Sequence, residues 1–434
     1  MRRDFVSLIA LAFTLVFPSP GFAQSTTSVF ISKSPRIDVK ALVGKANSGN
    51  PEAQYQLGLA YERGLGVERS EYEAMRWYRF AANSGHTEAQ NNLAYLYETG
   101  PDGLKDVAEA VKWYRRGAVY GSCMAQFNLG RLYLYGLGVQ QSREEALHWI
   151  RKSVDAGCSR AVAALAQMYA TGQGIPRDTE QALKLAKKAA KEHSSEGEAV
   201  LGVLYVDGLG VSENLKEGAA WLSKAAKNGS ATGQFALGML YETGHGVEKN
   251  TQEAARLFRL AADQGAREAQ RTLGQIYEFG QGVPIDGKEA VEWYRRAADQ
   301  GDTESAARLG KIFLLGSGVD KNIDEAVKFL TLAADKGNAY AQFNLAGLYA
   351  SATGVKLDLR KACSLFTLAG KTLDVTQQLN EVSSRLARED PASQQSGPHE
   401  ISHKPKAAPK PNREYFRQSP SFSIRTRSHS PRWQ

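Results

Sequence analysis

Residues that could carry chemistry are sparse in this chain of 434 residues. The seven histidines are scattered, and outside residues 391–434 none stands in a His-x-x-x-His pair of the spacing used by zinc sites. His399 and His403 do have this spacing, but they lie in a Pro-rich segment that is expected to be disordered rather than helical. No Cys-x-x-Cys pair occurs either, and three cysteines are few for a disulfide-stapled exported protein. We therefore predict no metal site, no cofactor and no catalytic residue. The histidines are His86, His148, His193, His245, His399, His403 and His429.

Glycine-containing motifs of enzymes are also missing or incomplete. The segment from Gly282 to Glu289 comes close to a phosphate-binding loop, but it lacks the Ser or Thr that would hold magnesium. The many G-x-G pairs follow expected helices rather than strands, which excludes a dinucleotide-binding fingerprint. No G-x-S-x-G nucleophile elbow is present. These patterns favour a binding protein over an enzyme.

The dominant feature of the sequence is a block of 36 residues that recurs nine times without a length change, from Ala53 to Thr376. Self-similarity at this period predicts a stack of similar helical units, each contacting mainly its neighbours. Such a stack presents a long surface rather than a deep pocket. The copies start at Ala53, Ala89, Ala125, Ala161, Gly197, Gly233, Ala269, Ser305 and Ala341.

Each copy contains the pattern of two helices. In the first helix, a Leu at the fifth position, a Gly or Ala at the sixth and a Tyr or Phe at the ninth recur at helical spacing, as in Leu57, Gly58 and Tyr61. A glycine such as Gly64 or Gly100 then stands where a left-handed cap would end this helix.

The second helix has a good capping residue in all nine copies, followed three positions later by Glu or Gln in eight of them. The pair Ser70 and Glu73 resembles a reciprocal capping box. The recurring Trp residues of this helix, such as Trp77, are assigned to the core. The predicted N-caps are Ser70, Asp106, Ser142, Asp178, Asn214, Asn250, Asp286, Asn322 and Asp358.

An A-x-x-x-L-G-x-x-Y opening, a G-x-G-V loop and an A-x-x-W-Y-x-x-A-A second helix together carry a family resemblance. On these motifs, residues 53–376 resemble the Sel1-like repeat family, which is related to the tetratricopeptide repeats. The resemblance implies an all-α fold, a right-handed αα superhelix (solenoid) of nine Sel1-like repeats that acts as a protein-interaction scaffold. Some exported members carry a paired cysteine in nearly every repeat. This chain lacks that pattern, so the enzyme activity claimed for that subgroup is not carried over.

The segments outside the repeats have different compositions. Residues 1–23 have the charged start, apolar stretch and small-residue cleavage site of a signal peptide, by the general secretory or the twin-arginine route. Residues 24–36 are expected to be a flexible leader, 37–52 an N-terminal capping helix and 377–390 a C-terminal capping helix. No other segment is a candidate transmembrane anchor after signal cleavage.

Residues 391–434 hold seven of the 14 prolines, with eight Lys or Arg against two Glu, and are expected to be a disordered basic tail. This tail supplies about six of the net eight positive charges, so the repeats are close to neutral, which argues against a nucleic-acid groove. The tail either attaches to an anionic envelope surface or is a dispensable extension.

Cys123 and Cys158 lie 35 residues apart, one short of the period, at the closing turns of adjacent repeats. A disulfide between them requires an unusually close approach of these turns, because bonded Cα atoms lie within about 7 Å. Whether they pair stays open. Cys363 falls in an apolar slot and is expected to be a small buried side chain.

In tetratricopeptide geometry the first helices line the concave face. Five positions of each first helix would then point into the groove, and the aromatic, amide and Arg residues found there resemble a protein-binding composition. The predicted partner-binding residues are Tyr55, Gln56, Glu62, Asn91, Asn92, Tyr95, Glu98, Phe127, Asn128, Arg131, Tyr135, Phe235, Arg271 and Gln275.

We therefore expect an exported protein, periplasmic or secreted, that serves as a non-catalytic scaffold for a protein partner. Two alternatives remain open. The first is an envelope hydrolase that acts on cell-wall fragments or β-lactams. The second is a polysaccharide-binding module in which exposed aromatic side chains stack on sugar rings.

Overall fold

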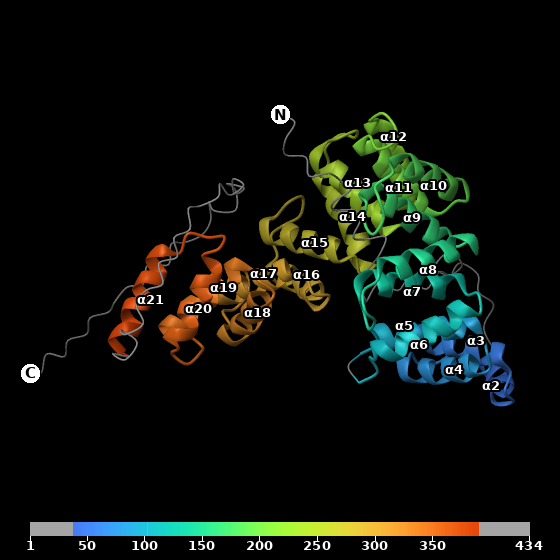
Figure 1. Ribbon diagram of the computed structural model, residues 1–434, viewed down its shortest axis with the longest axis horizontal. Helices are drawn as coiled ribbons and strands as arrows, with labels where there is room; N and C mark the ends of the chain where they lie inside the picture. Colours follow the sequence, from blue (N-terminus) through green and yellow to red (C-terminus); the bar gives the residue numbers. More distant parts are fainter. Residues whose placement is uncertain (1–37, 102, 390–434) are drawn as a thin grey trace, which may run out of the picture. The chain divides into compact units, whose positions relative to one another are not determined.

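The computed structural model describes residues 38–101 and 103–389. These residues form twenty helices, α2 to α21, joined by short turns (Figure 1). The repeats all lie in one compact unit, which ends at Ser383 within α21. The predicted signal peptide, leader and basic tail lie outside the described residues. Helix α2 (Val39–Asn47) precedes the repeats and α21 (Thr376–Glu389) follows them.

Each repeat is a pair of antiparallel neighbours, a first helix and a second helix. The first helices are α3 (Pro51–Arg63), α5 (Thr87–Thr99), α7 (Cys123–Tyr135), α9 (Ser159–Thr171), α11 (Ser195–Asp207), α13 (Ala231–Thr243), α15 (Arg267–Phe279), α17 (Thr303–Leu315) and α19 (Ala339–Ser351). The second helices are α4 (Glu71–Asn83), α6 (Val107–Val119), α8 (Arg143–Asp155), α10 (Thr179–Lys191), α12 (Leu215–Lys227), α14 (Thr251–Asp263), α16 (Gly287–Asp299), α18 (Ile323–Asp335) and α20 (Leu359–Ala369).

Packing follows the order of the chain. Every first helix packs against the second helix of its own repeat, and that second helix packs against the next first helix, as α3, α4 and α5 do. First helices of successive repeats also touch one another, for example α9 with α11 and α11 with α13. The predicted all-helical stack of nine units is confirmed.

The N-caps of the second helices are confirmed in all nine repeats, each side chain accepting a hydrogen bond from the first turn. At Ser70 the hydroxyl accepts from Glu73 N–H at 3.2 Å. The reciprocal half of the expected capping box is not made, because the Ser70 N–H instead donates to the carbonyl oxygen of Tyr61 at 3.0 Å. The same bond to the ninth residue recurs in every repeat and ties the second helix to the first.

Left-handed glycines end seven of the first helices, as Gly64 does with φ of 68°. The expectation is wrong at Gly100, which has φ of −60° and ψ of 165°. The following residue is Pro101, whose ring restricts the residue before it to extended conformations. In the ninth repeat, Ala352 takes up the left-handed conformation, with φ of 53°.

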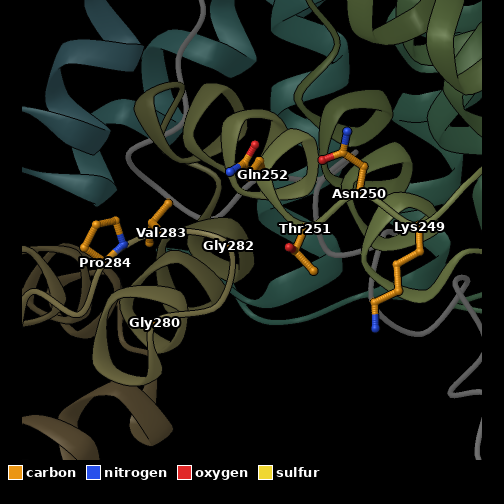
Figure 2. Close-up of a pocket in the computed structure, with 8 residues that line it drawn as sticks. All are labelled: Lys249, Asn250, Thr251, Gln252, Gly280, Gly282, Val283 and Pro284. Carbon is orange, nitrogen blue, oxygen red and sulfur yellow. The ribbon is translucent and has the colours of Figure 1, made fainter.

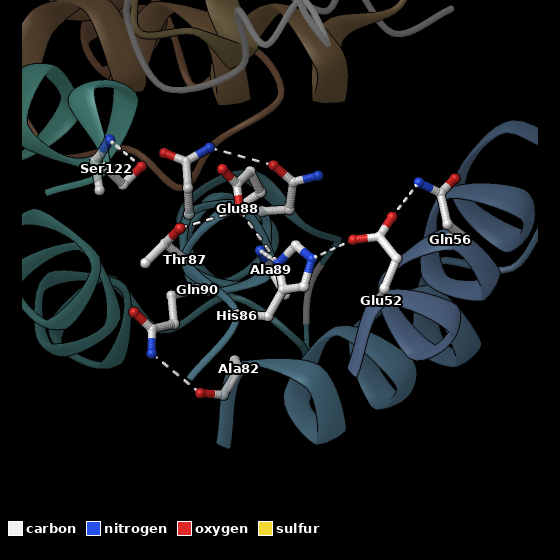
Figure 3. Close-up of polar contacts among 12 residues, drawn as sticks. Glu52, Gln56, Ala82, His86, Thr87, Glu88, Ala89, Gln90 and Ser122 are labelled. Carbon is white, nitrogen blue, oxygen red and sulfur yellow. Dashed lines mark hydrogen bonds and ion pairs between the residues drawn. The ribbon is translucent and has the colours of Figure 1, made fainter. Parts of the chain in front are cut away.

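A glutamine at the second position of six copies joins neighbouring repeats. The Gln90 side chain reaches back across the turn, and its Nε2 donates to the carbonyl oxygen of Ala82 at 3.0 Å (Figure 3). That carbonyl lies in the last turn of α4, where backbone acceptors have no partner within the helix. The bond recurs at Gln54, Gln126, Gln234, Gln270 and Gln342.

The core lies between the two helices of each pair. Leu57 and Tyr78 are fully buried in the first repeat, and the ring of Tyr78 lies against Gly58 so closely that a Cβ there would come within 2.6 Å of it. The small sixth residue is thus required for close approach of the two helices. Of the recurring tryptophans, Trp77 and Trp293 are buried, whereas Trp113, Trp149 and Trp221 are half-buried.

Candidate functional site

The fourteen residues predicted to bind a partner divide into two groups. Ten have accessible side chains, and four are buried. The accessible residues are Tyr55, Gln56, Glu62, Asn91, Asn92, Tyr95, Asn128, Tyr135, Arg271 and Gln275. The buried residues are Glu98, Phe127, Arg131 and Phe235. Eight of the accessible residues lie on α3, α5 and α7, and we call these eight the first-helix surface.

Amide side chains connect two adjacent repeats on this surface. The Nδ2 of Asn128 on α7 donates to Oδ1 of Asn91 on α5 at 3.0 Å. Asn91 in turn donates to Oδ1 of Asn92 at 3.2 Å. Amide groups can both donate and accept, so this row offers its remaining hydrogen-bonding groups to an extended ligand.

A charged and aromatic cluster lies at the start of α5 beside this row, and Figure 3 shows its polar contacts. His86 caps α5, with its Nδ1 accepting from Ala89 N–H at 3.3 Å, and its Nε2 lies 3.0 Å from Glu52 Oε2. The Tyr55 ring stacks on the imidazole with centroids 4.5 Å apart. Hydrogen bonds from Gln56 and His86 lower the pKa of Glu52. Neither His86 nor Glu52 was among the predicted residues.

The signal that could have identified His86 is its place in the chain. It occupies the turn position at which Asn50 and Ser122 cap α3 and α7, and an imidazole nitrogen can accept the same hydrogen bond. His86 has no partner at metal-ligand spacing in the sequence, so that criterion does not distinguish it from the other scattered histidines.

Glu62 and Glu98 at the tenth position are held by tyrosines of the second helix. The Tyr78 hydroxyl donates to Glu62, and the Tyr114 hydroxyl donates to Glu98 at 3.1 Å. Burial raises the pKa of both phenols, which keeps them protonated and able to donate. These carboxylates therefore have a structural role in holding the two helices of a repeat together.

Glu98 also forms an ion pair with Arg131 of the next repeat, in which the Arg131 side chain is 6% exposed and the Glu98 side chain 1%. The expectation that both face solvent is wrong. The carboxylate and guanidinium satisfy each other beneath the surface, which is the condition under which charges can be buried. They connect α5 to α7 rather than binding a partner directly.

Phe127 and Phe235 are also buried, at 1% and 2% exposure. Phe127 belongs to the same hydrophobic cluster as Ala163, Ala164 and Val200 of the next two first helices, whose small side chains allow close packing. Phe235 packs on Phe258 with ring centroids 5.4 Å apart. Both phenylalanines therefore belong to the core.

The remaining accessible residues lie farther along the chain or at the end of α7. Arg271 binds Asp302, the capping residue of α17, with Nη1 2.8 Å from Oδ2. Gln275 is half-buried on α15. Tyr135 is 39% exposed at the end of α7, and burial of its ring raises its pKa.

An open polar pocket lies between the start of α14 and the loop after α15 (Figure 2). Lys249 and Asn250 line one side, and Gly282 and Pro284 line the other. The loop is the segment that resembles a phosphate-binding loop. It makes the ordinary turn between two helices, and Asp286 at its end accepts the Lys288 N–H to cap α16. The same capping of the second helix is found in the other eight repeats.

Among the residues that the structure describes, no group of three His, Cys, Asp or Glu side chains is placed to hold a metal ion. Within the same residues, no helix has the length and apolar character needed to cross a membrane.

Comparison with known proteins identifies the repeat. The Sel1 repeat family matches nine segments, residues 51–86, 87–118, 123–158, 159–194, 195–230, 231–265, 267–302, 303–338 and 339–371. A curated relative, DAP3-binding cell death enhancer 1 of Mus musculus, is 38% identical over 64 residues, which are 14% of this chain and only 12% of that protein.

Solved structures with similar sequences include two bacterial proteins of this kind. A protective antigen present in uropathogenic Escherichia coli strains, displaying an SLR fold, is 32% identical, with 80% of this chain and 82% of that chain covered and a TM-score of 0.42. A Sel1 repeat protein from Oxalobacter formigenes is 26% identical, with 81% and 90% covered and a TM-score of 0.45. Nine matched segments make the assignment plain: the chain belongs to the Sel1 repeat family.

Proposed function

We propose that this protein is a non-catalytic scaffold that binds a protein partner on the first-helix surface of its first three repeats. The observation that carries the proposal is the continuity of accessible aromatic and amide side chains across α3, α5 and α7. Tyr55, Asn91 and Asn128 come from three successive repeats, and the last two are joined directly by a hydrogen bond.

Contacts between successive repeats support the proposal because they hold the three helices in fixed register. The ion pair between Glu98 and Arg131 connects α5 to α7, and His86 connects α5 to Glu52 of α3. A preorganised surface loses less side-chain entropy when a partner binds, which favours affinity. Half-buried tyrosines such as Tyr95 offer large contact areas with few rotatable bonds.

We further propose that the protein works outside the cytoplasm. The charged and apolar character of residues 1–23 supports export, and the basic composition of residues 391–434 supports contact with an anionic envelope surface. The partner would then be an envelope or extracellular protein.

To test the proposal, the full chain is immobilised on a support and incubated with envelope extract, and the retained protein is identified. The affinity of the purified partner for the chain is then measured. Tyr95→Ala should weaken binding by about tenfold or more, as expected for an interface aromatic. The matched control is Tyr72→Ala on α4, because Tyr72 is 66% exposed on a second helix. Equal affinity of the two variants would contradict the proposal.

Two further outcomes separate the alternatives. If the protein hydrolyses muropeptides or a chromogenic β-lactam, and one point mutation abolishes this activity, the hydrolase function would replace the proposed scaffold function. If the protein binds a glycan array, loses this binding in Tyr55→Ala and captures no protein from the extract, the polysaccharide-binding function would replace the proposed one.

A further inference from the structure

Helix α9 begins differently from most of the first helices. Seven of the nine begin with a residue whose side chain accepts a hydrogen bond from the first turn. At α7 this residue is Ser122, whose hydroxyl accepts from Ala125 N–H. At α9 it is Cys158, which forms no such capping bond. Cysteine at this position therefore gives up part of the usual stabilisation of the helix start.

The Cys158 side chain lies against the start of α7 in the preceding repeat. Its Sγ is 3.6 Å from Sδ of Met124, the residue that follows Cys123 in α7, and its backbone N–H donates to the carbonyl oxygen of Ser153 at 3.0 Å. Ser153 of α8 fixes this end of α7, since its hydroxyl donates to the Cys123 carbonyl oxygen at 2.6 Å. Two cysteines of adjacent repeats are thus held side by side.

The surroundings of the two thiols favour reaction between them. Cys158 is 5% exposed, whereas Cys123 is half-buried, so one thiol of the pair can be reached from solvent. The hydrogen bond donated by Cys123 lowers the pKa of Cys158, against the opposing effect of burial, and the N–H of Ala161 adds to this stabilisation of the thiolate. Thiolates are the species that react in thiol–disulfide exchange.

We propose that Cys123 and Cys158 form a reversible disulfide that joins the third repeat to the fourth. The reaction is exchange with a disulfide oxidant, either a small molecule or a protein. The Sγ–Sγ bond forms as the two thiols lose two electrons and two protons, and the S–S bond of the oxidant is cleaved and reduced to two thiols.

The consequences follow from the position of the bond. It closes a loop between residues 35 positions apart, which removes entropy from the unfolded chain and stabilises the folded one. It also fixes the start of α7, the helix that carries Asn128 and Tyr135 of the first-helix surface, against the start of α9. The bond requires no partner, so this inference is independent of the proposed function.

The test is a thiol count on the folded full chain after incubation with oxidised glutathione and removal of the excess. All remaining free thiols are blocked with a maleimide under denaturing conditions, and the peptides are analysed without reductant by mass spectrometry. We expect one maleimide, on Cys363, together with a cross-linked peptide pair containing Cys123 and Cys158. Maleimide on all three cysteines, or glutathione retained on Cys123 without cross-linking, would overturn the proposal.

Variants separate a disulfide from a general effect of oxidant on stability. In the unmodified chain and in the control Cys363→Ser, oxidation should raise the melting temperature by several degrees. In Cys123→Ser and Cys158→Ser it should change nothing, and serine already occupies both helix positions elsewhere, as at Ser159 and Ser122. An equal rise in all four proteins would overturn the proposal. If one variant does not fold, the other gives the same comparison.

Discussion

A tyrosine at position 258 should stabilise the sixth repeat, because it would supply a hydrogen bond that three other repeats have. In these, a Glu at the tenth position accepts from a Tyr sixteen residues later, as Glu278 does from Tyr294 at 2.7 Å. The sixth repeat keeps the acid, Glu242, but has Phe258 in place of the tyrosine. Burial raises the pKa of Glu242, as expected for a carboxylate without that donor.

The geometry indicates that the new hydroxyl would fit. The Phe258 ring lies against Gly238 just as the Tyr294 ring lies against Gly274, with a Cβ at either glycine coming within 2.8 Å or 2.7 Å of the ring. A hydrogen bond to a charged group contributes about 1.5 kcal/mol net. We therefore expect Phe258→Tyr to raise the free energy of unfolding by about that amount, and to move the pKa of Glu242 down towards its ordinary value.

The measurement is urea-induced unfolding followed by circular dichroism, with amide hydrogen exchange in α13 and α14 to localise the effect. Tyr294→Phe is the matched reverse change and should destabilise by a similar amount. In a Glu242→Ala background, Phe258→Tyr should lose its benefit, since the buried hydroxyl would have no acceptor. Stabilisation that persists in that background, or destabilisation by Phe258→Tyr alone, would refute the reasoning.

Three further changes test other contacts. Gln90→Ala removes the bond to the Ala82 carbonyl and should destabilise by about 1 kcal/mol in urea unfolding; an unchanged midpoint would show that the bond contributes nothing. Ala352→Gly relieves a left-handed alanine and should stabilise by about 1 kcal/mol in thermal unfolding, and a lower melting temperature would contradict this. Glu242→Gln should stabilise the protein at neutral pH, because the raised pKa means that ionised Glu242 destabilises the folded state. This advantage should shrink as pH falls through the raised folded pKa and vanish below the unfolded pKa of about 4.3, as pH-dependent unfolding will show; an advantage that is constant with pH would be the opposing result.

The repeat architecture could be predicted from the sequence because each copy carries its own local signals. Ser70 and Gly64 are good examples, since a cap and a left-handed turn depend on neighbouring backbone alone. The predictions of local structure were wrong where another residue or another helix changed the local hydrogen bonds or backbone conformation. Pro101 altered the turn at Gly100, and the Tyr61 carbonyl took the Ser70 N–H that a reciprocal capping box would have used.

The candidate surface was less predictable, because exposure depends on distances between repeats that the periodicity does not contain. Position along a helix placed Phe127 on the outer side, but the small residues of α9 let it join a buried cluster. Glu98 and Arg131 occupy different positions of different copies, so no regular spacing indicated their ion pair. The contact between Cys123 and Cys158 likewise depends on how closely the turns of two repeats approach.

Side-chain footprinting of the complex tests the central claim most directly. Hydroxyl-radical labelling of the full chain, with and without its purified partner, reports the accessibility of each tyrosine. We expect Tyr55, Tyr95 and Tyr135 on the first helices to be protected in the complex. Tyr72 and Tyr120, which are 66% and 67% exposed, should be labelled equally in both states. Protection of Tyr72 and Tyr120, with the first-helix tyrosines unchanged, would contradict the central claim.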